Sequence, residues 1–267
     1  LPVHQRIPAG TVGMPLAPGA AARIFTGAPV PSGADAVVMQ EDCVAVDAVA
    51  GGLPGVQVKI PPQAGMAIRR AGEDVASGQV VLQRGERLTP ASLGLAASIG
   101  FDKLQVAPRV RVALFSTGDE LVMPGEVAPA DMKPGAIYNS NRFFLRALLL
   151  RLGCTVTDMG IVPDRLDATI SALKNACAGN DLILTSGGVS VGEEDHIKPA
   201  VQVLGELTLW QMAIKPGKPF AYGRVAHEQH AAHFIGLPGN PVSSFVTFLM
   251  LARPFILKLQ GATELPP

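Results

Sequence analysis

Short apolar runs separated by proline and glycine make up the first part of the chain. Two such runs are Ala36–Met39 and Val56–Ile60, and proline and glycine recur around both of them. Residues of these two types break regular structure and favour tight turns. We therefore predict a small β-rich domain over residues 1–78.

The pattern changes over residues 79–107, which we interpret as a connector. Thr89 and Pro90 precede a short apolar segment, Ala91–Ser98, that ends near Gly100. A hydroxyl side chain before a helix can cap its free N–H groups, and proline fits the first helical turn. The segment is therefore predicted to be one short helix between two larger domains.

From residue 108 onward, apolar runs of strand length alternate with segments of helical periodicity. Strands are predicted at Val110–Phe115, Cys154–Val162, Asp181–Thr185, Leu207–Ala213, Phe220–Gly223 and His233–Leu237. Helices are predicted from Asn141 to Leu152, after an Asp164 cap, over Asp195–Leu204, and after Pro241, where Pro254 kinks the helix or begins a new one. This alternation predicts an α/β domain over residues 108–267, with a mixed, mostly parallel sheet sandwiched by helices.

The composition is that of a folded protein, with 48% hydrophobic and 16% charged residues among 267. Lys+Arg and Asp+Glu are equal at 22 each. No net charge therefore draws the chain to nucleic acid or to acidic lipid, and we expect neither as a partner. Any anion that the chain binds must be recognised by a local group of residues.

The three cysteines, Cys43, Cys154 and Cys177, lie far apart and form no paired motif. Such cysteines are typical of reduced thiols in a cytoplasmic protein, and Cys177 falls on the apolar face of a predicted helix. We find no signal peptide and no apolar run that spans a bilayer, because Pro238–Pro241 interrupts the longest uncharged stretch, Ala231–Ala252. The chain begins without an initiating Met, so we expect a fragment of a longer protein.

Four turns carry residues that could bind a ligand or take part in catalysis, and each of these turns follows a predicted strand. Ligands of open α/β sheets bind beyond the carboxyl ends of the strands. The first turn is Ser116, Thr117, Gly118, Asp119 and Glu120. Its hydroxyls and carboxylates can bind a ligand hydroxyl or a divalent cation, and the alternative is an ordinary turn with solvated acids.

The second turn, Thr185–Asp195, is the most informative. Its small and hydroxyl residues include Ser186, Gly187, Gly188, Ser190 and Gly192. The glycines let the backbone N–H groups approach a ligand, and the following helix adds its positive N-terminal dipole. The turn is neither a Walker A loop nor a dinucleotide fingerprint. Asp195 is either the cap of that helix or a metal ligand, and the spacing alone favours the cap.

The third turn places Lys215 and Lys218 on either side of a Pro-Gly pair. Prolines stiffen the backbone, so both ammonium groups can converge on one anion in a preorganised site. The alternative is a solvated turn, where lysines are common. We favour the anion site.

The fourth turn leads from a strand into a helix. It contains Pro238, Gly239, Asn240, Pro241 and Ser243. Glycine permits a close approach, and serine places a hydroxyl in the first helical turn. One such turn is weak evidence, but four in one sheet predict a single phosphate-binding site.

The remaining candidates carry less weight. His227, His230 and His233 recur at every third residue, but they have one carboxylate nearby and no cysteine. A solvated loop is therefore favoured over a metal site. Trp210 is assigned to the core. Hydrolase chemistry lacks a visible nucleophile arrangement or zinc motif.

The turns, in this order, resemble those of the molybdopterin molybdenumtransferases, the family that includes the E domain of gephyrin and its plant counterpart. The matching segments are Arg23–Glu41, Ile68–Val75, Ser116–Leu121, Ile137–Asn141, Thr185–Lys198, Lys215–Phe220 and Leu237–Ser244. They extend over nearly the whole chain, and the TGAPVP and LPGNP motifs are highly specific together.

The resemblance implies that molybdenum from molybdate is inserted into the dithiolene of adenylylated molybdopterin, with release of AMP and help from Mg²⁺ or another divalent cation. The matching catalytic residues are Asp119, Glu120, Asp195, Lys215 and Lys218, with Glu120 and Asp195 as metal ligands. The substrate-binding residues are Thr26, Asp74, Ser116, Thr117, Gly118, Ser186, Gly187, Gly188, Ser190, Gly192, Pro238, Gly239, Asn240, Pro241 and Ser243. The family's site lies between the subunits of a homodimer, so Thr26 and Asp74 are expected to act on the partner's α/β domain.

The chain also departs from the family pattern. Family members carry a segment with an acidic motif before Leu1 and a β-barrel domain after residue 267. Asn139 stands where Asp is common, so we assign it no metal role. The alternatives are a molybdopterin adenylyltransferase, which the long first domain disfavours, and a scaffold without enzymatic activity, for which no peptide groove is visible in the sequence.

Overall fold

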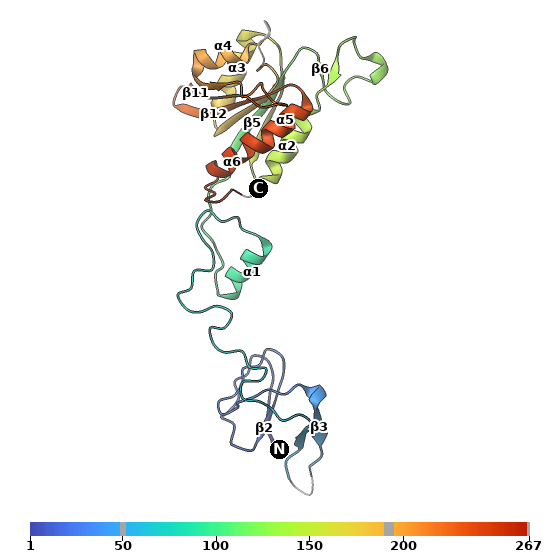
Figure 1. The fold of residues 1–267 in the computed structure, drawn as a ribbon, viewed down its shortest axis with the longest axis vertical. Coiled ribbons are helices and arrows are strands. Elements are labelled where there is room, and N and C mark those ends of the chain that lie inside the picture. The colour runs from blue at the N-terminus through green and yellow to red at the C-terminus, as the bar shows by residue number, and fades with distance from the viewer. Residues whose placement is uncertain (49–51, 190–194, 266–267) are drawn as a thin grey trace. The chain divides into compact units, whose positions relative to one another are not determined.

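The computed structural model describes residues 1–48, 52–189 and 195–265. Its helices and strands are shown in Figure 1. The chain forms two compact units, Leu1–Val80 and Val81–Pro267. We describe each unit by itself.

The first unit holds short strands and a 3₁₀ turn joined by long loops. Its elements are β1 (Val3–Ile7), β2 (Ala21–Ile24), η1 (Gln40–Asp42), β3 (Cys43–Val46) and β4 (Gly55–Val58). β1 and β2 pair in parallel, whereas β3 and β4 pair antiparallel. A strand thus forms within the Val56–Ile60 run, but Ala36–Met39 forms none, because Val37 donates its N–H to a loop carbonyl, Met66 O.

The second unit begins with loops and a single helix, α1 (Pro90–Ser98). The Ser92 N–H donates to the Thr89 hydroxyl over 3.1 Å, and the Thr89 N–H donates back to the Ser92 hydroxyl. This reciprocal pair is a capping box, and Pro90 occupies the first turn. The helix predicted in the connector is therefore confirmed.

The strands of the second unit form a mixed sheet in the described residues. Its order is β10 (Gly205–Trp210), β11 (Ala221–His227), β12 (His230–Leu237), β9 (Leu182–Ser186), β5 (Arg111–Thr117) and β8 (Thr155–Val162). The last four strands in this order run parallel to one another. β11 runs antiparallel to both of its neighbours, β10 and β12. A separate short pair, β6 (Leu121–Val122) and β7 (Ile137–Tyr138), follows β5. The predicted mixed, mostly parallel sheet is confirmed.

Helices cover both faces of this sheet, as Figure 1 shows. They are α2 (Asn141–Arg151), α3 (Leu166–Cys177), α4 (Ile197–Leu204), α5 (Pro241–Thr247), the π-helical segment η3 (Phe248–Ala252) and α6 (Arg253–Leu259); η2 (Pro129–Asp131) lies in a loop. Along β5, Ala113 and Phe115 point to the face that α3 and α4 cover, while Val112 and Leu114 point to the face of α2 and α6. This alternation follows from the two-residue period of a strand.

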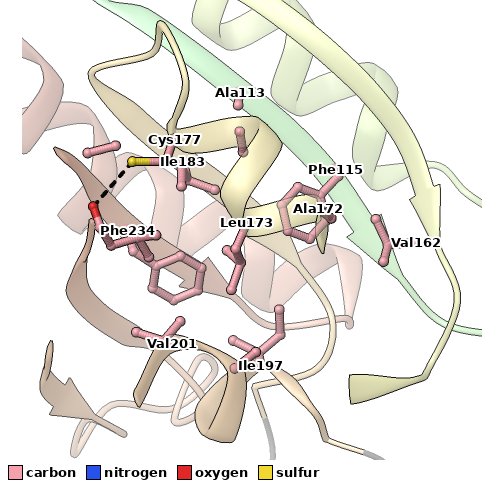
Figure 2. Close-up of a cluster of buried hydrophobic side chains, with 14 of the residues drawn as sticks. Ala113, Phe115, Val162, Ala172, Leu173, Cys177, Ile183, Ile197, Val201 and Phe234 are labelled. Atoms are coloured by element: carbon pink, nitrogen blue, oxygen red, sulfur yellow. Dashed lines mark hydrogen bonds between the residues drawn. The ribbon is translucent and has the colours of Figure 1, made fainter. Parts of the chain in front are cut away.

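The core beneath α3 and α4 is drawn in Figure 2. Phe115, Leu173 and Phe234 are fully buried there. The thiol of Cys177 donates to the backbone carbonyl of Val225, the dashed contact in the figure, which confirms that this cysteine is a core residue. The expected core residue Trp210 is half-buried at the edge of the same cluster.

The last helical run continues through Pro254, because the π-helical turns of η3 come directly before it and Pro254 falls in the first turn of α6. Among the described residues this run, Pro241–Leu259, is the one helix long and apolar enough to cross a membrane by length and composition. The sequence analysis expected no such segment. Phe248, Ala252 and Ile256 pack against the sheet, as the buried face of a core helix does.

His227 and His230 lie on strands and not in the loop that we predicted, whereas His233 lies on the strand that was predicted to begin there. β11 extends to His227, which pairs with His230 across a tight hairpin. His233 lies in β12, with Nδ1 3.0 Å from the Tyr222 hydroxyl. Within the described ranges, no three His, Cys, Asp or Glu residues are placed to hold a metal ion.

Candidate functional site

Three of the four predicted turns lie at one edge of the sheet. β12, β9 and β5 are adjacent and parallel, so the fourth, second and first turns leave the sheet side by side. The Gly187 N–H donates to Leu237 O over 3.0 Å, and the buried hydroxyls of Ser116 and Ser186 lie 3.0 Å apart. The sheet therefore brings these turns together as the sequence predicts.

The second turn lies directly against the first. Gly187 has a φ of +91°, and a Cβ atom there would stand 2.5 Å from Thr117 O. Only glycine combines this backbone conformation with so close an approach. The Thr117 and Ser186 side chains are both buried beneath the turns.

The start of α2 adds two asparagines that the sequence analysis did not assign to the site. The Ser116 hydroxyl donates to Asn139 Oδ1 over 3.4 Å, and Asn141 Nδ2 donates to Gly239 O over 2.8 Å. Asn141 thus connects α2 to the fourth turn, 98 residues further along the chain. The match of Ile137–Asn141 to the family pattern is the sequence signal that could have indicated these two residues, although not their contacts.

The fourth turn is fixed by its own helix. Asn240 Oδ1 accepts the Ser243 N–H over 3.0 Å, and Pro241 occupies the first position of α5. This cap leaves Gly239 exposed between the sheet and the helix, above the buried Pro238. The turn thus presents backbone and not bulky side chains.

The third turn returns to the same edge by a different route. Ala221 of β11 pairs with Gly236 of β12, so the loop that precedes β11 lies beside the carboxyl end of β12. Gly217 is buried, and a Cβ atom there would stand 2.5 Å from Thr247 Cγ2 of α5. Lys215 and Lys218, on either side of this anchored glycine, are exposed.

Buried polar atoms without hydrogen-bond partners gather at this edge. Among the described residues they are Thr117 Oγ1, Asn139 Nδ2, Asn141 Oδ1, Thr185 Oγ1 and Ser244 Oγ. Each lies at the end of a strand or in the first turns of a helix that begins at this edge. A buried polar atom without a partner costs about 1–3 kcal/mol, so such a cluster is typical of a polar ligand site.

The acidic residues of the first turn are exposed. The Asp119 carboxylate accepts the Asp164 N–H over 3.1 Å. A Cβ atom on Gly118 would stand 2.5 Å from Glu120 Oε2, so the Glu120 carboxylate lies over this glycine. Asp164 is not the cap of α3, because the cap position falls on Arg165 and no side chain bonds there.

Asp195 is half-buried just before α4. The cap position of α4 falls on His196, so the prediction that Asp195 caps this helix was wrong. Ser190 and Gly192 lie outside the described residues. Thr26 and Asp74 belong to the first unit, where Thr26 is exposed and Asp74 forms an ion pair of 2.7 Å with Arg69.

Arg165 and Asp167, whose pKa values shift through their mutual contact, follow the carboxyl end of β8, and further pKa shifts occur away from this edge of the sheet. At the amino ends of β5 and β9, hydrogen bonds from Arg111 hold the pKa of Asp181 below its usual range. Burial raises the pKa of Cys154 to about 11. Burial, and then the charge of Arg224, lower the pKa of His233.

Two family models match the chain. A probable molybdopterin binding domain matches residues 113–258, and the MoeA N-terminal region (domain I and II) matches residues 2–100. Both models together extend over most of the two units.

Named relatives and solved structures agree with these matches. The molybdopterin molybdenumtransferase of Haemophilus influenzae is 45% identical over 91% of this chain and 57% of its own length. Molybdopterin molybdenumtransferase 2 of Mycobacterium tuberculosis is 41% identical over 99% of this chain and 64% of its own length. A molybdopterin biosynthesis MoeA protein of Pyrococcus horikoshii is 28% identical over 99% of this chain and 62% of its own, with a TM-score of 0.76. The chain thus spans less than two thirds of these relatives.

Proposed function

The chain belongs to the molybdopterin molybdenumtransferase family, and we propose that it binds adenylylated molybdopterin and inserts molybdenum from molybdate into it with release of AMP. This reaction is a step of molybdenum cofactor biosynthesis, which we place in the cytoplasm. The observation that carries the proposal is the cluster of buried, unpartnered polar atoms where the four turns meet.

The glycine-rich turns suit the pyrophosphate of the substrate. Gly188 and Gly239 lie at the carboxyl edge of the sheet, where their N–H groups can bind phosphate oxygens, whereas the Gly187 N–H already donates to Leu237 O. The hydroxyls of Thr117, Thr185 and Ser244 are the unpartnered groups that can donate to the same ligand. We therefore assign these hydroxyls to the substrate site together with Ser116, Ser186 and Ser243.

Lys215 and Lys218 supply the positive charge for molybdate. Both lie on the turn that Gly217 anchors against α5, and both are exposed to an incoming oxyanion. Molybdate carries two negative charges, so a pair of ammonium groups on a stiff turn can bind and orient it. In the reaction the two dithiolene sulfurs bond to molybdenum and one molybdate oxygen leaves as water with the two thiol protons, while a water molecule adds its oxygen to phosphorus as one P–O bond of the pyrophosphate breaks and AMP leaves.

Glu120 and Asp195 are the residues that would hold a divalent cation. Mg²⁺ is usually bound by one or two carboxylates together with substrate phosphates, so it needs no cluster of three acids. The exposed Glu120 carboxylate beside the first turn fits this donor set. When bound, the cation would withdraw charge from the pyrophosphate. Asp119 would orient this turn.

The proposal includes a homodimer in which Thr26 and Asp74 of one subunit act on the second unit of its partner. The experiment for this part mixes two impaired variants, D74A and K218A, at a molybdate concentration low enough that K218A alone shows little activity. Each mixed dimer would contain one intact site, so we expect activity to return on mixing. Absence of any recovery, with dimers confirmed by light scattering, would argue against a shared site.

The experiment for the reaction measures AMP release by the complete protein from adenylylated molybdopterin. We expect release with molybdate and Mg²⁺ and none when molybdate is left out. Formation of adenylylated molybdopterin from ATP and molybdopterin would instead favour the adenylyltransferase. Absence of both reactions, with the folded protein retaining peptide partners, would favour the scaffold.

A further inference from the structure

The third turn is closed at its base by backbone hydrogen bonds. The Gln211 N–H donates to Phe220 O over 2.8 Å, and the Met212 N–H donates to Lys218 O over 2.9 Å. These bonds hold the two ends of the turn together. They do not determine where the tip of the turn lies relative to the fourth turn, so a further contact must do so.

The tip of the third turn lies against one side chain of α5. Gly217 is buried with a φ of +113°, and a Cβ atom there would stand 2.5 Å from Thr247 Cγ2. The methyl group of Thr247 therefore occupies the space that a side chain at position 217 would need. Lys215 and Lys218 lie within two residues of this contact, so a shift of the tip would move both ammonium groups.

The hydroxyl group of the same side chain bonds to the start of α5. Thr247 is fully buried, and its Oγ1 donates to Ser243 O over 2.8 Å and to Ser244 O over 3.2 Å. A threonine hydroxyl that is bonded to the preceding helical turn fixes the rotation about the Cα–Cβ bond, and it therefore also fixes the direction of the methyl group. Ser243 in turn donates its N–H to the Asn240 cap of the fourth turn. One side chain thus connects the third turn with the fourth.

We propose that Thr247 is a positioning residue, whose methyl group fixes the tip of the third turn so that Lys215 and Lys218 meet molybdate at a set distance from the phosphates bound by the fourth turn. The role toward molybdate rests on the proposed function, whereas the fixing of the turn does not. Thr247 is buried and acts through Gly217, not on the substrate.

Three variants of the complete protein test the contact: T247S, T247V and T169S. The first keeps the hydroxyl and removes the methyl group, and the second keeps a methyl group and replaces the hydroxyl by another. The third is the matched control, because Thr169 is buried in α3 and its hydroxyl donates to Arg165 O, four residues earlier, over 2.9 Å. Thr169 belongs to none of the four turns.

Hydrogen exchange by mass spectrometry measures the turn without any ligand. We expect about fivefold faster exchange in the peptide that covers residues 211–220 of T247S, since a buried methyl contact is lost. T247V and T169S should exchange at the wild-type rate in this peptide. A role of Thr247 in helix stability alone would give the opposite order, because valine leaves the carbonyls of Ser243 and Ser244 without the hydroxyl donor. Unchanged exchange in a folded T247S, or equal acceleration in T247V, would overturn the contact as a fixing device.

A double-mutant cycle measures the contact between Gly217 and Thr247 directly. G217A introduces the Cβ atom that would meet the methyl group. We expect G217A to lower the midpoint of urea unfolding by less in the T247S background than in wild type, because serine leaves room for the added atom. Equal losses in the two backgrounds would overturn the contact.

The molybdate arm measures AMP release at varied molybdate. We expect the KM for molybdate to rise about fivefold in T247S and to return toward wild type in T247V, since a small displacement of binding groups weakens their action. The kcat and the KM for adenylylated molybdopterin should not change. Faster exchange in T247S together with a wild-type KM for molybdate would overturn the positioning role. If wild type itself released no AMP, the proposed function would fail, and the exchange result would still decide whether Thr247 fixes the turn.

Discussion

Gly188 lies against Thr117 so closely that a Cβ atom on Gly188 would stand 2.7 Å from Thr117 Oγ1 and 2.8 Å from Ile197 Cγ1. Its φ of +65° is also unfavourable for any other residue. We expect G188A to lower the free energy of unfolding by about 2–3 kcal/mol, because overpacking adds to backbone strain. Urea unfolding followed by circular dichroism measures this change.

G179A is the matched control for G188A. Gly179 has a φ of +83°, but a Cβ atom there would meet no atom within 4 Å. Only the backbone term applies, so we expect a loss of about 1 kcal/mol. Equal losses in the two variants would contradict the close packing of the second turn on the first.

Lys215 and Lys218 provide the second prediction. K215A and K218A should each raise the molybdate concentration for half-maximal AMP release about tenfold, since each removes a charge-assisted contact to the oxyanion. Both lysines are exposed, so the melting temperature should not change. Steady-state assays at varied molybdate measure the effect.

Lys103 is the control for these two lysines. It is exposed in the segment before β5 and belongs to none of the four turns. K103A should keep the wild-type molybdate dependence. If both K215A and K218A also kept it, the assignment of an anion site to the third turn would be wrong.

The sequence predicts those parts of the fold that depend on residues close together along the chain. Thr89 and Pro90 determine the start of α1 locally, and the structure confirms them. β11 extends four residues beyond the predicted Phe220–Gly223 because its hydrogen bonds come from β12, and pairing between strands is invisible in the pattern of one strand. Asp164 likewise has a local role in the sequence and a distant partner, Asp119, in the structure.

In the candidate site, too, features that depend on one segment are predictable from the sequence, and contacts between distant segments are not. Glycines after strands indicate turns that approach a ligand, and the structure places Gly187 against Thr117 as that interpretation requires. The contribution of Asn141 depends on its contact with Gly239, 98 residues away. Only the order of the strands reveals that contact, so no motif in a single segment could have predicted it.

Two substitutions at Asn240 test its contribution to stability and its contribution to ligand binding separately. N240A removes the acceptor of the Ser243 N–H and should lower the free energy of unfolding by about 1 kcal/mol. N240D keeps an acceptor and should keep the stability, but its negative charge would repel the phosphates and weaken substrate binding. Urea unfolding and calorimetric titration with adenylylated molybdopterin measure the two effects.

Thr89 supplies the control for Asn240, because it caps α1 and lies in none of the turns. T89A should lower the stability by a similar amount and leave the substrate affinity unchanged. If N240D bound the substrate as tightly as wild type, Asn240 would be a structural cap and nothing more.

His233 makes the stability of the second unit sensitive to acid. Burial and the charge of Arg224 hold its pKa below the ordinary value of 6.5, and its Nδ1 lies 3.0 Å from the Tyr222 hydroxyl. The unfolded chain therefore takes up a proton on His233 at a higher pH than the folded chain. The stability contributed by the neutral ring is present above about pH 6.5 and is lost as the pH falls through the lower, folded pKa.

The test compares melting temperatures at about pH 7.5 and about pH 5. We expect the melting temperature of H233Q to fall by less than that of wild type between these two values, because glutamine takes up no proton. H230Q, at an exposed position of the same hairpin, should follow wild type, and a wild-type pH dependence in H233Q would show that another group is responsible.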